Sequence, residues 1–187
     1  MLEVLFQYGP LTFRSFDLLL AVGFIFSLFF LIKYVLRKKM NLSFLADSLF
    51  LLIISGLILG RLFYFMEHAN ALSKHWFRVF FIWDLQFSPA GILYGTLGTL
   101  FWRCRQYKED FWAWLDAIVL SGLILLFFVS LGNFMEGSNY GLPTTLPWGI
   151  AFNNISIPFA VPIHPTQLYA AVAIFSIFSY LIHYAKR

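Results

Sequence analysis

Long apolar runs joined by short polar connections dominate this chain. Four runs are long enough to cross a bilayer as helices: residues 16–36, 48–66, 112–132 and 167–184. Each predicted boundary carries an error of a few residues. A further segment, residues 88–102, is short for a span and rich in glycine and alanine. The pattern predicts an all-α, polytopic membrane bundle of about five transmembrane helices in a single domain, residues 1–187.

Composition supports the membrane assignment. The chain has 187 residues, of which 60% are hydrophobic, and its mean hydropathy of +0.78 excludes a soluble globule. Its single cysteine, Cys104, allows no intrachain disulfide and is interpreted as a structural thiol. The sequence has no HExxH or CxxC spacing and no clustered histidines, so we expect no metal and no other cofactor.

The N-terminus lacks the charge and cleavage pattern of a signal peptide, so we expect none to be removed. Residues 2–7, LEVLFQ, match a protease site used in expression tags, but Tyr8 follows them in place of glycine. We interpret the segment as native.

Lysine and arginine are concentrated on one side of the predicted spans. Residues 37–39, 103–108 and 186–187 carry most of the basic charge and fall on one side if five helices alternate. Because cytoplasmic loops carry the excess of basic residues, we predict an N-terminus outside and a cytoplasmic C-terminus. Membrane orientation thus explains the net charge of +4. No nucleic-acid partner is needed to account for it, and none is expected.

Polar residues gather at the predicted outer ends of the spans. In residues 131–141, LGNFMEGSNYG, Gly132 and Asn133 followed by Gly137 and Gly141 predict a helix that unwinds into a glycine-rich turn. The N–H groups of such a turn can hold a phosphate or an oxyanion. Glycines that cap a helix or pack against a neighbouring helix are the ordinary alternative.

His164 and Pro165 are predicted to begin the last helix, with Pro165 near its first turn. His164 can serve as a general base or orient a phosphate, and a structural hydrogen-bonding role is the alternative. Arg61 lies deep enough in the second span to need a partner, for which Glu67, Asp17 or an anionic headgroup are candidates. Alternatively, the long side chain of Arg61 lets its guanidinium reach the outer membrane interface.

Five ordered segments together resemble the prolipoprotein diacylglyceryl transferase family. Residues 8–14, YGPLTFR, resemble its N-terminal opening, and residues 59–62, LGRL, resemble its second-helix GGRxGY element. Residues 83–95, WDLQFSPAGILYG, are similar to its WDGGMSFHGGLxG segment. Residues 131–141 resemble its GRxGNFxNGExxG signature, and residues 164–169, HPTQLY, its HPSQLYE.

The resemblance implies a bacterial inner-membrane enzyme whose active face is outside. Its substrates would be phosphatidylglycerol or a related phospholipid and the signal peptide of a prolipoprotein, whose cysteine thiol receives the diacylglyceryl group. Asn133 carries over from the family signature, and His164 is hypothesised to replace the family's missing base, so these two are the predicted catalytic residues. The substrate-binding residues predicted with them are Arg14, Arg61, Gly132, Gly141, Gln167 and Tyr169.

Several family residues are replaced. The family's histidine aligns with Ala90, the arginine before its GNF with Ser130, the glutamate of its NGE with Ser138 and the tyrosine of its opening with Phe16. The sequence also ends one helix after HPTQLY, so the family's last two helices, with another functional arginine, have no counterpart. Three hypotheses therefore stay open: a divergent transferase, a catalytically silent relative that binds phospholipid or a signal peptide, and a small membrane interaction or transport subunit.

Overall fold

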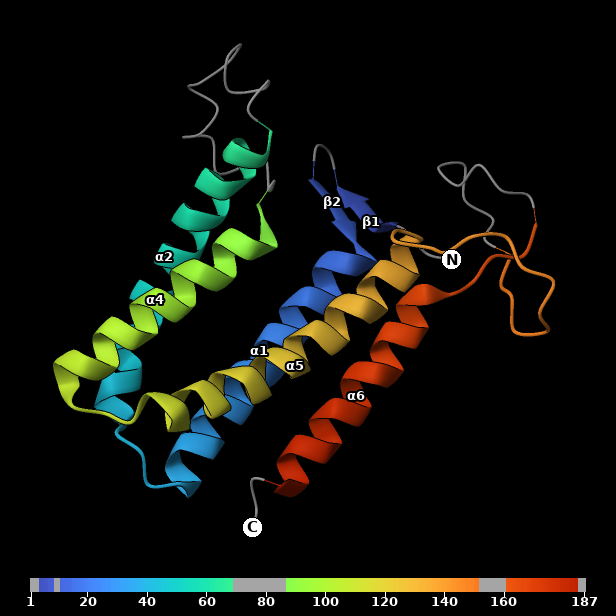
Figure 1. The fold of residues 1–187 in the computed structure, drawn as a ribbon. Helices are drawn as coiled ribbons and strands as arrows, with labels where there is room; N and C mark the ends of the chain where they lie inside the picture. Colours follow the sequence, from blue (N-terminus) through green and yellow to red (C-terminus); the bar gives the residue numbers. More distant parts are fainter. Residues whose placement is uncertain (1–3, 9–10, 69–86, 152–160, 185–187) are drawn as a thin grey trace. The chain divides into compact units, whose positions relative to one another are not determined.

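The computed structural model describes residues 4–8, 11–68, 87–151 and 161–184, and the side chains among them from residue 14 onward. Within these residues the regular elements are helices and one short hairpin, joined by irregular segments (Figure 1). The elements are β1 (Val4–Tyr8), β2 (Leu11–Arg14), α1 (Ser15–Arg37), α2 (Leu42–Glu67), α4 (Pro89–Tyr107), α5 (Phe111–Glu136) and α6 (Thr166–Tyr184).

The predicted membrane helices are confirmed. Among the described residues, α1, α2, α5 and α6 are long and apolar enough to cross a membrane. At 1.5 Å per residue the 19 residues of α4 extend about 28 Å, but α4 is not apolar enough to join that set. Helix α2 starts at Leu42, earlier than predicted, because the side chain of Asn41 accepts a hydrogen bond from the N–H of Phe44 (3.2 Å) and caps the helix.

The chain divides into two compact units. The first comprises Met1–Tyr34 and Ala117–Arg187, and the second Val35–Asp116. The first unit thus holds the hairpin, α6 and most of α1 and α5, and the second holds α2 and α4. The prediction that residues 1–187 form a single domain remains a prediction.

In the second unit α2 and α4 lie side by side through facing glycines (Figure 1). A Cβ atom at Gly91 would lie 2.3 Å from the carbonyl oxygen of Leu59, and one at Gly95 would lie 2.4 Å from that of Ser55. The hydroxyl of Ser55 donates to the carbonyl of Gly95 (3.1 Å). Gly91 and Gly95 have the spacing of a GxxxG motif, which lets two backbones approach closely where lipid provides little driving force for helix association.

A buried arginine joins the same two helices near the C-terminal end of α4. The Arg103 guanidinium donates to the Ser48 hydroxyl (3.2 Å), the Asp47 carbonyl (3.3 Å) and the Gln106 side chain (2.9 Å). It also lies over the ring of Tyr107, 4.4 Å from the centroid. These contacts explain how a charged side chain that is 6% exposed is tolerated at this position.

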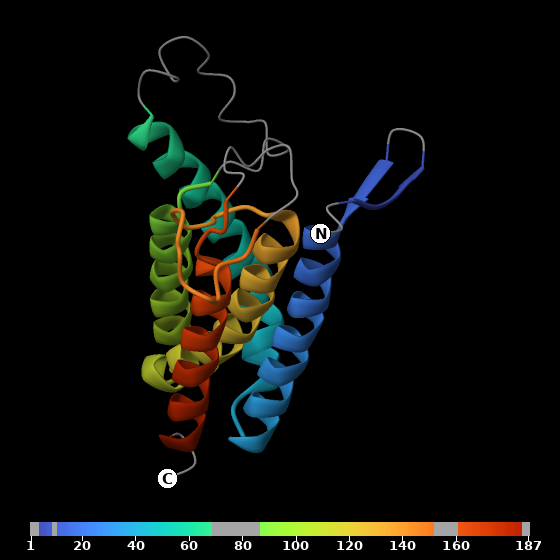
Figure 2. The same cartoon turned by 90° about the vertical axis from the view of Figure 1, so that its right-hand side faces the viewer.

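In the first unit α1 packs closely on α5. A Cβ atom at Gly23 would lie 2.5 Å from the Cβ of Phe128, and the Ser27 hydroxyl donates to the Ser121 carbonyl (2.7 Å). Aromatic contacts of Phe30 with Phe178 and of Phe127 with Phe175 join α6 to these two helices. The antiparallel hairpin pairs Gln7 with Thr12 and Tyr8 with Leu11, and it projects beyond the start of α1 (Figure 2). The sequence pattern did not predict this hairpin.

Candidate functional site

Helix α5 continues through Gly132 and Asn133 and ends at Glu136. The helix therefore runs four residues past its predicted end at Gly132, and the predicted turn with glycine follows it. The turn begins at Gly137, whose φ of 77° suits glycine, and the N–H groups of Gly137 and Ser138 donate to the carbonyl of Asn133 (2.9 and 3.0 Å). These bonds cap the helix, since they satisfy a terminal carbonyl that has no partner within it.

The two glycines predicted to bind substrate have a visible packing role. A Cβ atom at Gly132 would lie 2.8 Å from the Phe16 ring, so Gly132 lets α1 approach α5. A Cβ atom at Gly141 would lie 2.8 Å from the Cβ of His164, and the N–H of Gly141 donates to the carbonyl of His164 (3.0 Å). The N–H groups of Gly137, Ser138 and Gly141 are thus occupied by carbonyls of the chain, which argues against a phosphate cradle built from them.

A polar network covers the end of α5. The guanidinium of Arg14, at the end of β2, donates from Nη1 to Oε1 of Glu136 (3.2 Å). The Ser138 hydroxyl lies 3.2 Å from Oδ1 of Asn133 and 3.4 Å from Oε2 of Glu136. Arg14 is 56% exposed and Glu136 22%, so the network opens toward the surface. Arg14 is remote from Glu136 along the chain, so the sequence alone does not indicate this pair.

The start of α6 lies against the turn after α5. Helix α6 begins at Thr166, one residue after Pro165, whose carbonyl accepts bonds from the N–H groups of Leu168 and Tyr169. Nδ1 of His164 and the hydroxyl oxygen of Tyr169 lie 3.0 Å apart, within hydrogen-bond distance. The Thr166 hydroxyl donates to the Asn139 carbonyl (2.6 Å). His164 and Tyr169, both predicted site residues, are therefore brought together.

Gln167, a predicted site residue, is buried, with 3% of it exposed. Its amide nitrogen donates to the carbonyl of Ser138 (2.5 Å), whereas its Oε1 has no hydrogen-bond partner in the part of the chain that is described. Gln167 thus ties α6 to the turn after α5 and leaves one acceptor unused.

Arg61 belongs to the second unit. It is 4% exposed, and its guanidinium carbon lies 5.0 Å from the ring centroid of Phe65 and 5.9 Å from that of Phe87. Glu67, one of its candidate partners, accepts a hydrogen bond from the Ser88 hydroxyl (2.6 Å). The burial of Arg61 agrees with the expectation that it lies too deep for an isolated charge.

The four positions at which the resemblance implies replaced family residues differ in environment. Ala90 is exposed in the first turn of α4. Ser130 is buried, and its hydroxyl donates to the carbonyl of Leu126 within α5 (3.0 Å). Ser138 belongs to the polar network, and Phe16 packs on Gly132.

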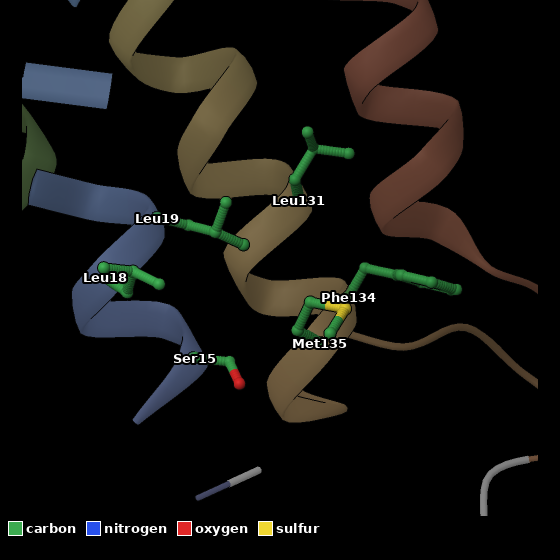
Figure 3. A pocket seen from close by; sticks show the side chains of 6 residues that line it. All are labelled: Ser15, Leu18, Leu19, Leu131, Phe134 and Met135. Atoms are coloured by element: carbon green, nitrogen blue, oxygen red, sulfur yellow. The ribbon is translucent and has the colours of Figure 1, made fainter. Parts of the chain in front are cut away.

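A pocket of about 350 Å³ lies between the first turns of α1 and the last turns of α5 (Figure 3). It is lined by Ser15, Leu18, Leu19, Leu131, Phe134 and Met135. Five of these six side chains are apolar. No group of three or more metal-ligating side chains is present among the described residues.

The comparison with known proteins bears on the whole chain. Residues 3–187 match the model of the prolipoprotein diacylglyceryl transferase family. The chain belongs to this family.

Curated relatives agree with the family assignment. The phosphatidylglycerol–prolipoprotein diacylglyceryl transferase of Geobacter sulfurreducens is 33% identical over 172 residues, which cover 90% of this chain and 65% of the relative. The protein of the same name from Caulobacter sp. (strain K31) is 32% identical, with 96% and 69% covered. That from Synechococcus sp. (strain CC9902) is 28% identical, with 95% and 65% covered. This chain therefore spans about two thirds of the length of the relatives it matches.

Proposed function

We propose that this chain transfers the diacylglyceryl group of phosphatidylglycerol to the cysteine thiol of a prolipoprotein. The observation that carries the proposal is the clustering of Arg14, Glu136 and Asn133 at the end of α5, with His164 and Tyr169 at the adjoining start of α6. This reaction requires a base and a cation, and hydrogen-bonding groups can assist both; a histidine can serve as the base.

The reaction displaces a phosphate ester from a glycerol carbon. The thiol gives up its proton, its sulfur forms a bond to the carbon, the carbon–oxygen bond breaks, and glycerol phosphate leaves with the bonding electrons. The chain must therefore supply a base near the sulfur and positive charge near the phosphate.

His164 is the proposed base. In the tautomer that donates from Nδ1 to the Tyr169 hydroxyl, Nε2 keeps its lone pair and can accept the thiol proton. Arg14 is the proposed phosphate ligand, because its guanidinium is largely exposed while Glu136 orients it. Asn133 would contribute an amide N–H to a substrate oxygen, since its Oδ1 lies against the Ser138 hydroxyl.

We further propose that the chain resides in the bacterial inner membrane with this site facing outward. The basic residues near positions 37–39 and 103–108 support a cytoplasmic location for the opposite ends of the helices. A cysteine introduced at Arg14 should react with an impermeant maleimide in intact spheroplasts, and one at Lys38 only after lysis. The reverse pattern would contradict this orientation.

The activity is tested with purified chain, phosphatidylglycerol and a lipobox peptide, with the mass of the peptide as the readout. We expect a diacylglyceryl adduct on the cysteine that is lost with His164→Ala and Asn133→Ala. His183→Ala, at the far end of the same helix as Tyr169, is the matched control and should retain the adduct. Absence of an adduct with the unaltered chain, under conditions where a relative forms one, would contradict the proposal.

A further inference from the structure

The pocket between α1 and α5 has a mainly apolar lining that suits a hydrocarbon chain. Its lining offers a single polar side chain, Ser15, and its volume of about 350 Å³ falls within the range of small-ligand sites. Leu18, which lines it, is 55% exposed and belongs to a helix long and apolar enough to cross a membrane, so the pocket opens at the surface of that helix. A hydrocarbon chain can therefore enter from the bilayer without crossing a polar surface.

A charged pair adjoins the same pocket. Arg14 directly precedes Ser15, and Glu136 directly follows Met135, so the ion pair joins the helix ends between which the pocket lies. The described contact of Arg14 uses only Nη1, and the guanidinium is more than half exposed. A phosphate can thus bind the remaining N–H donors while Glu136 keeps its own bond.

We propose that this pocket holds one acyl chain of an anionic phospholipid whose phosphate binds Arg14. The inference deepens the proposed function and rests on it, because it identifies where the lipid substrate would be held. An apolar groove beside an exposed guanidinium matches an amphiphile with a hydrocarbon tail and an anionic phosphate at one end.

A signal peptide fits the pocket less well. An extended peptide would bury N–H and C=O groups that the apolar lining cannot satisfy, whereas an acyl chain has no such groups. A helical peptide is about 10 Å wide, too wide for a pocket of this volume. We therefore assign the lipid and treat the peptide as an outcome of the test.

The test is photo-crosslinking of the full chain in nanodiscs. The probe is phosphatidylglycerol with a diazirine in one acyl chain, and mass spectrometry locates the crosslinks. We expect them to concentrate on the pocket lining, and unlabelled phosphatidylglycerol to compete about tenfold better than phosphatidylcholine, a factor that corresponds to one charged contact.

Matched variants separate the pocket from the general lipid surface. Leu131→Trp fills the pocket and should lower crosslinking of the probe to the pocket lining about tenfold. Leu126→Trp changes a 51% exposed leucine outside the pocket on the same helix and should leave this crosslinking unchanged. Arg14→Gln should abolish the preference for the anionic lipid and Arg14→Lys should keep most of it. Because Arg14 is exposed, these two variants test the proposal even if Leu131→Trp does not fold.

Three results would overturn the inference: crosslinks spread evenly over the exposed faces of α1 and α5, equal competition by both lipids, or displacement of the probe by lipobox peptide alone. The readout needs no acceptor peptide and no transfer. Crosslinking as expected without an adduct in the transfer assay would therefore contradict the proposed function only. Transfer without pocket crosslinking would contradict the inference only.

Discussion

The guanidinium of Arg14 and the carboxylate of Glu136 are 122 positions apart in the chain, yet their nearest atoms lie 3.2 Å apart. The contact joins the end of β2 to the end of α5 and adjoins both the polar network and the apolar pocket. Because the pair is exposed to solvent, it adds little to stability and its value lies in orienting a cation.

This arrangement predicts that Arg14→Ala separates activity from stability. The free energy of unfolding should change by less than about 1 kcal/mol, as for other exposed ion pairs. The transfer rate should fall by about 10²–10³-fold, the loss typical of removing one donor to a developing negative charge. Arg14→Lys should retain part of the rate. Equal losses of stability and rate would show that the pair is structural.

The histidine and tyrosine at the start of α6 should differ in importance. His164→Ala should lower the transfer rate by about 10²–10⁴-fold, the contribution of a general base, whereas Tyr169→Phe removes only the group that orients the ring and should cost less. Tyr180→Phe, at a 67% exposed tyrosine of the same helix, is the control. A Tyr169→Phe loss as large as that of His164→Ala would assign tyrosine a direct role.

The packing of α2 on α4 predicts opposite effects for two glycines of α4. Gly95→Ala should destabilise the protein by about 1–3 kcal/mol, because its Cβ would lie 2.4 Å from a backbone oxygen. Gly98→Ala meets nothing within 4 Å and should be neutral or stabilise by up to about 1 kcal/mol through helix propensity. Thermal unfolding in detergent measures both. Similar shifts for the two variants would contradict this close approach.

Replacement of Arg103 and of Arg105, two residues apart on α4, should lower the thermal stability of the protein by different amounts. Arg103→Ala removes donors from the fully buried Ser48 hydroxyl and from the Asp47 carbonyl and should cost about 1–3 kcal/mol. Arg105 is exposed, and its replacement by alanine should change stability by less than about 0.5 kcal/mol.

The thiol of Cys104 should react only slowly in the folded protein. Its side chain is 2% exposed, so a maleimide should label it slowly in the native state and rapidly after denaturation in SDS. Rapid native labelling would show that the end of α4 opens readily.

Local sequence was sufficient for the membrane helices. Each span could be predicted from an apolar run of bilayer length, since a helix satisfies its backbone hydrogen bonds within one segment and needs no remote partner. Motif order was likewise enough to indicate the family that the comparison confirmed. His164 and Tyr169 could be singled out together because they lie within two turns of each other.

The tertiary structure decided what depends on remote residues. The end of α5 at Glu136 is fixed by bonds to the carbonyl of Asn133, and the β1–β2 hairpin pairs two strands that the apolar pattern did not indicate. The Arg14–Glu136 pair and the apolar pocket arise only when the start of α1 packs on the end of α5, which Gly132 permits by leaving room for Phe16. Apolar patterning determines which segments enter the membrane, but the contacts between them depend on side-chain shape at positions far apart in the chain, and only the packed helices specify those.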